Sequence, residues 1–245
     1  DAGVIGKFLR ASSPELIRCP APASTRQERH GKTMSQHPNL TVIGFMGAAE
    51  SGKNTAAKLV ADTLARNYEA IIETAFAAPL KQAVYNLDPV IDTKENGEQI
   101  RLAKEVDLNG WDYTKHTYPE ARRLLQKMGT EVGRDLFGED FWVKTLLRDV
   151  QYRVEGKTLV LITDVRFENE VKSIKEFENH LLIHLSRGEN SLGDTERAHA
   201  SERDLSHLAD VRINNTGSLD DLDEILQETI RVYAPQAIQE KDDQE

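Results

Sequence analysis

A glycine-rich stretch early in the chain has the residues of a phosphate-binding loop. Residues 44–59 are GFMGAAESGKNTAAKL, and Gly47, Gly52 and Lys53 match G-x-x-x-x-G-K. The hydroxyl comes one place late, because Asn54 follows the lysine and Thr55 comes next. Such a loop offers backbone N–H groups and an ammonium group to a polyphosphate, and a hydroxyl to Mg²⁺. The spacing predicts a phosphoryl-transfer site, with an ordinary glycine-rich turn as the alternative.

A second candidate closes an apolar run. The segment TLVLITDVRF, residues 158–167, brings Asp164 to the end of a buried strand and Arg166 two places later. An acid in this position is typical of a residue that reaches Mg²⁺ beside a phosphate loop. Arg166 could stabilise charge on the transferred phosphoryl group. The alternative is an aspartate that caps the next helix and an ordinary surface arginine.

The segment 119–142 concentrates arginines and amides outside an apolar stripe. Its polar positions are Arg122, Arg123, Gln126, Thr130 and Arg134. An arginine fork binds phosphate bidentately, so this face suits an acceptor monophosphate, although a solvated helix face has the same composition. Lys81, in the first turn of a helix at 78–87, is either a second anion-binding group or a surface lysine.

The polar segment 187–208 has the length and composition of a closing lid, with Arg187 and Arg197 able to reach phosphates. A mobile surface loop is the alternative. His199 has no Cys or His cluster around it, so metal ligation there is not expected.

Apolar strands alternate with amphipathic helices around these groups. We expect strands at 40–45, 68–76, 158–163, 180–186 and 209–214, and helices at 53–67, 78–87, 119–136, 140–154, 167–179 and 222–233. Residues 88–118 are polar and rich in turn signals, which indicates an irregular insertion near the site. The pattern predicts an α/β fold of the P-loop NTPase type, with three α/β/α layers and a mainly parallel central sheet of about five strands. Ligands bind such sheets at the carboxyl ends of the strands.

Composition narrows the function classes. The net charge of −10 argues against a general nucleic-acid binder, and no apolar run is long enough to span a membrane. The single cysteine, Cys19, excludes an intrachain disulfide and favours the cytoplasm.

The first 38 residues differ from the rest, with six Lys and Arg against three Asp and Glu and no apolar period. We expect 1–38 to be a disordered leader or an expression-derived tail, with Met34 as a start and a transit peptide as the alternative. The kinase domain is then 39–235, including the insertion 88–118 and the lid 187–208, and 236–245 is an acidic tail.

Together these segments resemble the bacteriophage deoxynucleoside monophosphate kinases. The similarity covers most of residues 41–233 and rests on SGKNT, APLK, RRLLQKMGT with FWVK, ITDVRF, HASERDL and NNTGSLDDL, in the family's order. Several of these motifs are also similar to those of phosphomevalonate kinases, a related group. Phage kinases usually have Asp after the loop lysine, where this chain has Asn54.

The resemblance implies a role for each matched residue. The ATP donor would be bound by Gly47, Ala48, Ala49, Glu50, Ser51, Gly52, Lys53, Asn54, Thr55, Asn215 and Gly217, with the segment NNTGS, residues 214–218, near the adenine. The catalytic residues would be Lys53, Asp164, Arg166 and Arg187, with Mg²⁺ on Thr55 and Asp164. The acceptor would be bound by Lys81, Arg122, Arg123, Gln126, Arg134, Trp142, Arg197 and Glu202.

The expected activity is ATP-dependent phosphorylation of deoxynucleoside monophosphates in the cytoplasm, with ATP and Mg²⁺ as cofactors. The partners would be nucleotides, with a homodimer left open and neither nucleic acid nor membrane bound. Two alternatives stay open. One is a kinase of another small phosphorylated metabolite, such as a phosphomevalonate-like acceptor. The other is a nucleotide-binding module with weak catalysis, because an amide at Asn54 lacks the charge of a carboxylate.

Overall fold

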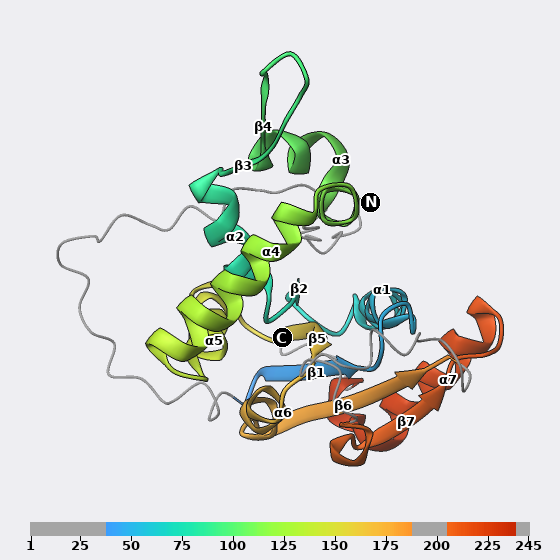
Figure 1. Ribbon diagram of the computed structural model, residues 1–245. Coiled ribbons are helices and arrows are strands. Elements are labelled where there is room, and N and C mark those ends of the chain that lie inside the picture. Colours follow the sequence, from blue (N-terminus) through green and yellow to red (C-terminus); the bar gives the residue numbers. More distant parts are fainter. Residues whose placement is uncertain (1–37, 188–204, 239–245) are drawn as a thin grey trace, which may run out of the picture. The chain divides into compact units, whose positions relative to one another are not determined.

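The computed structural model describes residues 38–187 and 205–238, which divide into two compact units (Figure 1). The first unit contains described residues 38–75, 147–187 and 205–238. The second unit contains residues 76–146. No helix in the described part of the chain is long and apolar enough to cross a membrane.

The first unit is built on a five-stranded sheet in the order β2-β5-β1-β6-β7, with every neighbouring pair parallel. The strands are β1 (Leu40–Met46), β2 (Ala70–Thr74), β5 (Thr158–Val165), β6 (Asn179–Ser186) and β7 (Val211–Asn214). All seven residues of β1 are buried, and β1 lies between β5 and β6 (Figure 1). A strand covered on both faces needs a continuous apolar run, which LTVIGFM supplies. The predicted parallel sheet is confirmed.

Helices cover both faces of this sheet. Ile43 and Phe45 of β1 share a buried cluster with residues of α1 (Lys53–Leu64) and α7 (Leu219–Tyr233). Gly44 faces the other way, because a Cβ built on it would lie 2.7 Å from the Ile174 side chain of α6 (Glu168–Lys175). Successive strand residues point to opposite faces, so α1 and α7 lie on one side and α6 on the other. The predicted three-layer α/β/α fold is confirmed.

The strand order reverses direction at β1. From β1 the chain goes to β2 on one side and returns through β5, whereas β6 and β7 lie on the other side. Such a switch point forms a crevice at the carboxyl ends of the strands, where ligands of open α/β sheets bind. The glycine-rich loop leaves β1 at this end.

The carboxyl-terminal part of the described chain is packed beyond the boundary expected at 235. Ala237, in a short 3₁₀ turn at Pro235–Ala237, is fully buried in the same cluster as α1 and α7. The Asn67 amide donates a 2.7 Å hydrogen bond to the Ile238 carbonyl. The packed chain therefore continues to the last described residue.

The second unit is mainly helical. Its elements are α2 (Ala78–Leu87), β3 (Val90–Thr93), β4 (Gln99–Arg101), α3 (Leu102–Thr117), α4 (Pro119–Lys127), a π-helix (Met128–Leu136) and the start of α5 (Phe141–Arg153). A small core joins them, formed by Val84, Ile91, Leu102, Val106 and Ala121.

The prediction that residues 88–118 are irregular is wrong. They form the antiparallel hairpin β3–β4 and the whole of a 16-residue helix, α3. Leu102 and Val106, four residues apart, give α3 a buried face. Gly110 has non-helical backbone angles and kinks the helix. The turn signal around Gly110 marks a break within a helix rather than a loop.

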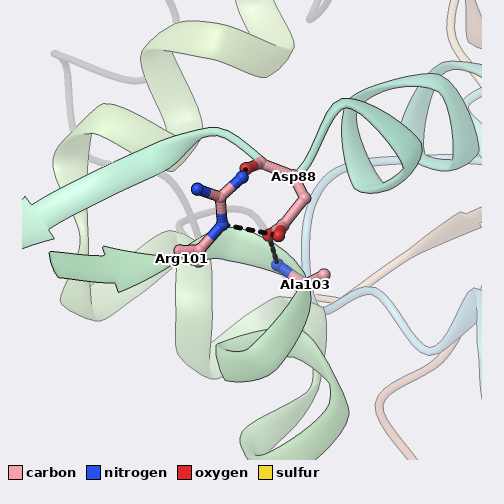
Figure 2. A network of polar contacts seen from close by, with 3 residues as sticks. All are labelled: Asp88, Arg101 and Ala103. Carbon is pink, nitrogen blue, oxygen red and sulfur yellow. Dashed lines mark hydrogen bonds and ion pairs between the residues drawn. The ribbon is translucent and has the colours of Figure 1, made fainter.

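The hairpin is fastened to both neighbouring helices by one carboxylate (Figure 2). Asp88 directly follows α2, and its Oδ2 accepts a 2.7 Å hydrogen bond from Arg101 Nε. Its Oδ1 accepts a 2.9 Å bond from the backbone N–H of Ala103, in the first turn of α3. The carboxylate thus satisfies a donor that a helix start leaves unpaired. The hydrogen bond from Arg101, with the Ala103 N–H, lowers the pKa of Asp88.

The prediction of a single α-helix at 119–136 is also wrong, in its second half. After α4 the backbone widens into a nine-residue π-helix, a rare form that usually occurs as one turn and often at functional sites. The wider turn breaks the predicted apolar stripe, so Val132 and Leu136 are 37% and 69% exposed. Gly133 is buried instead, against the ring of Trp142.

Candidate active site

The glycine-rich loop joins β1 to α1 and depends on two glycines. Gly47 has φ 130°, and a Cβ on it would lie 2.1 Å from the Leu185 carbonyl oxygen of β6. Gly52 has φ 99° and is the N-cap of α1. Only glycine adopts these angles without strain, and only glycine lets the loop approach the neighbouring strand so closely. The loop thus turns sharply into the amino end of a helix.

Lys53 is the first residue of α1, and its side chain is folded over the loop. Its ammonium group donates to the carbonyl oxygens of Gly47, at 2.8 Å, and of Ala48. Ser51 Oγ lies 3.4 Å from the same nitrogen. Lys53 is only 9% exposed, so its positive charge lies against the loop and is shielded from solvent. Phosphate oxygens bound by the loop would meet this ammonium group.

The candidate metal ligands come from the start of α1 and the end of β5. Thr55 is exposed in the first turn of α1. Asp164 is half-buried and lies in an irregularity of the β1–β5 pairing. Ile162 pairs with Gly44 but Val165 pairs with Met46, so β5 has one extra residue there. Such bulges are frequent beside active sites, where they redirect a side chain.

These two oxygen donors suit Mg²⁺, which takes few protein ligands and completes its shell with phosphates and water. Among the described residues no group of three or more His, Cys, Asp or Glu could hold a metal ion. A magnesium site here would therefore depend on the bound triphosphate for most of its ligands.

A buried glutamate, which the sequence analysis missed, organises the segment after Asp164. Glu170 is 3% exposed, and its Oε2 accepts the backbone N–H of Arg166 at 2.7 Å and of Phe167 at 3.1 Å. The Arg166 side chain is exposed. A glutamate at the third position of α6 is the sequence signal for this contact.

An open pocket of about 300 Å³ lies where β7 meets α7. It is lined by residues 213–217 and by Asp221, Leu222 and Ile225. It includes Asn215 and Gly217, which belong to the segment 214–218 that the family resemblance implies lies near the donor adenine. The Asn215 side chain also reaches the glycine-rich loop, because its Nδ2 donates to the Ser51 carbonyl at 3.0 Å.

The predicted lid falls largely outside the described residues. Arg187 follows β6 directly and is exposed. Arg197, His199 and Glu202 lie in 188–204, outside the described residues, as does the leader up to residue 37.

In the second unit, the candidate acceptor residues of α4 differ in their surroundings. Arg122 and Gln126 are exposed and one turn apart, and the Arg122 guanidinium makes no ion pair with any residue that the structure describes. Arg123 is bound by Glu120, with Nε 2.6 Å from Oε2 and a second bond to the other oxygen. The hydrogen bond with Glu120 raises the pKa of Arg123 and lowers that of Glu120. Arg122 is therefore the more available of the two.

Trp142 and Lys81 have protein neighbours in the same unit. Trp142 is 6% exposed, and its indole N–H donates to the Gly129 carbonyl at 2.9 Å. Its ring fills the space that a side chain at position 133 would need, so it supports the π-helix. The charge of Lys81 helps to lower the pKa of Asp112, whose main cause is the hydrogen bond from Lys115.

Comparison with known proteins shows the family to which this chain belongs. A family model described as "Deoxynucleotide monophosphate kinase" matches residues 117–226. An Acanthamoeba polyphaga mimivirus protein named "Putative deoxynucleotide monophosphate kinase" is 30% identical over 190 residues, 72% of this chain and 89% of the viral protein. The chain belongs to the deoxynucleotide monophosphate kinase family.

A second relative of this kinase is the "Deoxynucleoside-5'-monophosphate kinase" of Escherichia phage T5. It is 25% identical over 186 residues, 57% of this chain and 73% of the phage protein. Among solved structures, an APS kinase of Mycobacterium tuberculosis is similar with a TM-score of 0.34 and 13% identity, over 80% of this chain and 99% of that one. A shikimate kinase from Bacteroides thetaiotaomicron has a TM-score of 0.35 and 11% identity, over 78% and 99%.

Proposed function

We propose that this kinase transfers the γ-phosphoryl group of ATP to a deoxynucleoside 5'-monophosphate, giving ADP and the diphosphate. The observation that carries the proposal is the Lys53 ammonium group folded over a glycine-rich loop at the carboxyl end of β1. An oxygen of the acceptor phosphate attacks the γ-phosphorus as the bond to ADP breaks. The protein acts by positioning and by electrostatic stabilisation, without a covalent intermediate on a side chain.

On the donor side, the loop from Gly47 to Lys53 binds the β- and γ-phosphates. Thr55 and Asp164 would hold Mg²⁺, which supplies charge stabilisation at the phosphates when bound. Asp164 suits this role because its half-buried carboxylate lies in the β5 bulge, next to β1, the strand that leads into the loop. Arg166 would act on the transferred group, and the pocket that contains Asn215 and Gly217 would take the base.

On the acceptor side, Arg122 and Gln126 are the best placed of the candidates. Both are exposed on one face of α4, and a guanidinium that has not been taken by a carboxylate can bind phosphate with two parallel hydrogen bonds. Lys81, Arg123, Arg134 and Trp142 remain proposed acceptor residues, with Trp142 acting through the π-helix that it supports.

ADP release, measured with ATP and Mg²⁺ across the four dNMPs, the rNMPs and phosphomevalonate, tests the proposal. Stimulation by one or more dNMPs, lost when EDTA removes Mg²⁺, is the expected result. Stimulation by phosphomevalonate alone would keep the chemistry and replace the acceptor. ATP binding with no stimulation by any acceptor would indicate a nucleotide-binding module instead.

We also propose that the kinase works in the cytoplasm and binds nucleotides rather than nucleic acids, in keeping with its charge of −10 and single cysteine. A homodimer is proposed as its assembly, which light scattering on purified protein would test. Activity of a chain that starts at Met34 would test whether the kinase domain needs the residues before 34.

A further inference from the structure

The end of β7 is joined to the phosphate loop by a single side chain. Asn215 follows β7 directly, and its backbone N–H donates to the Ser186 carbonyl at the end of β6, at 2.7 Å. Its side-chain Nδ2 donates to the Ser51 carbonyl at 3.0 Å, across 164 residues of sequence. The backbone bond holds Asn215 at the sheet edge, so its amide is a fixed point for the loop.

The contact falls on the peptide that enters α1. Ser51 is 2% exposed, and Gly52 is the left-handed N-cap of the helix. A Cβ on Gly52 would lie 2.4 Å from Asn215 Nδ2, so the amide occupies the space that a side chain there would need. Gly52 therefore serves two purposes, since it permits φ 99° and lets Asn215 reach the backbone.

Because the peptide bond is planar, this contact also sets the direction of a backbone N–H that would donate a hydrogen bond to phosphate. No described peptide is cis, so the Ser51 carbonyl and the Gly52 N–H point in opposite directions from one rigid plane. Fixing the carbonyl with Asn215 fixes the direction of that N–H. It also fixes the residue before Lys53, whose ammonium group lies 3.4 Å from Ser51 Oγ.

We infer that Asn215 is a positioning residue, which sets the Ser51–Gly52 peptide so that the loop is preorganised for the donor triphosphate. The inference rests on the proposed function of the loop as the triphosphate site. It differs from the base-contact role implied by family resemblance. The Asn215 amide oxygen has no hydrogen-bond partner within the described chain and borders the pocket, so a base contact is the competing explanation.

Tripolyphosphate separates the two roles, because it has the charge of the ATP phosphates and no base. We would measure its affinity and that of ATP, each with Mg²⁺, by calorimetry on wild type, Asn215→Ala and Asn215→Leu. Leu keeps the branched shape of Asn but donates no hydrogen bond. A positioning role predicts that both variants bind both ligands about 3- to 10-fold more weakly, the value of one net hydrogen bond. The KM for ATP rises in both, and the KM for dNMP does not.

Asn214→Ala is the matched control, since Asn214 lines the same pocket and makes no bond to the loop among the described residues. Its tripolyphosphate affinity should equal that of wild type. All affinities are measured well below the melting temperature of each variant, so that loss of folded protein does not contribute.

The outcomes distinguish the two proposals. If Asn215→Ala and Asn215→Leu lose affinity for ATP but not for tripolyphosphate, Asn215 is a base contact and the inference is overturned. Unchanged affinity for both ligands overturns it as well. If wild type binds tripolyphosphate but phosphorylates no dNMP, the proposed reaction fails while the same variants still decide the role of Asn215. If wild type binds neither ATP nor tripolyphosphate, both the proposed function and the positioning role of Asn215 are wrong.

Discussion

The candidate phosphate-binding groups of the two units differ in kind. In the first unit the groups that would hold the donor are mostly backbone N–H groups, and their directions are set by Gly47, Gly52 and the strands around them. In the second unit the candidate groups are long side chains on the surface of α4 and the π-helix. The candidate groups of the first unit are fixed by the fold, whereas those of the second depend on which side chains are already engaged in ion pairs.

This difference has an energetic consequence. A backbone donor loses no side-chain rotamer entropy when a ligand binds, whereas an arginine must be ordered and any existing partner must be displaced. Arg123 has such a partner in Glu120, and Arg122 does not have one among the described residues. Substitutions in the first unit should therefore affect turnover most, and those on α4 should affect acceptor binding.

Lys53→Met should have the largest effect. The substitution keeps most of the aliphatic stem and removes the charge over the loop, so kcat should fall by about 100-fold or more, the order expected for losing one key electrostatic donor. Steady-state ADP release measures it. The melting temperature should fall only modestly, because the methionine fills the same space although it loses the hydrogen bonds to the Gly47 and Ala48 carbonyls. Turnover near that of wild type in a folded variant would show that the loop has no catalytic role, and the contrast between the two units would then be wrong.

Arg122→Ala should have the next largest effect. Charge-assisted hydrogen bonds contribute about 1.5–3 kcal/mol each, so the KM for dNMP should rise about 10- to 100-fold with the KM for ATP unchanged. Arg123→Ala is the matched neighbour. Its effect should be smaller, by up to about 5-fold, because phosphate must first displace Glu120 from this exposed ion pair.

Glu120→Gln sharpens the same contrast. Removing this carboxylate releases Arg123, so the KM for dNMP should fall slightly. Equal effects of Arg122→Ala and Arg123→Ala would show that existing ion pairs do not decide acceptor binding on α4. A rise in the KM for ATP would assign these arginines to the donor side instead.

The features that could be predicted from sequence lie mostly in the first unit. The strand β1, the loop and the position of Asp164 follow from local patterns, because a buried parallel strand needs an unbroken apolar run and a sharp turn needs glycine. The bulge at Asp164 could not be predicted, since it depends on how β5 pairs with a strand more than 100 residues away.

The second unit contains the larger errors, and their causes are tertiary. The π-helix is supported by Trp142, which packs on Gly133 and binds the Gly129 carbonyl, and the apolar pattern from 121 to 136 gives no sign of this. Sequence marks Arg122 and Arg123 as equivalents, although Glu120 is paired only with the second. The Asn215–Ser51 contact joins distant segments and was equally invisible.

Asn54→Asp should give a smaller change, in the direction of higher kcat. Asn54 is exposed in the first turn of α1, and that turn contains no acid. A carboxylate there gains about 0.3–1 kcal/mol of folded-state stability from the helix dipole. By orienting Mg²⁺-bound water it should also raise kcat about 2- to 5-fold, with little change in ATP affinity. Steady-state kinetics on both proteins side by side measure it. Equal or lower kcat in the aspartate form would leave Thr55 and Asp164 as the metal ligands without help from position 54.

The smallest effect should come from Asp88→Asn, which tests whether the second unit is held by its own ion pairs. The variant loses the charge that binds Arg101 and weakens the cap on Ala103, so the free energy of unfolding at pH 7 should fall by about 1 kcal/mol. Because folding lowers the pKa of Asp88, the contribution is present above the ordinary aspartate pKa of about 3.9 and is lost as pH falls through the lower folded value. Urea midpoints of the two proteins, measured from pH 7 downward, should therefore converge only below about pH 3.9. A difference between the urea midpoints that persists at the lowest pH would assign the effect to packing at position 88. The kcat of the variant, measured at saturating ATP and acceptor, should equal that of wild type.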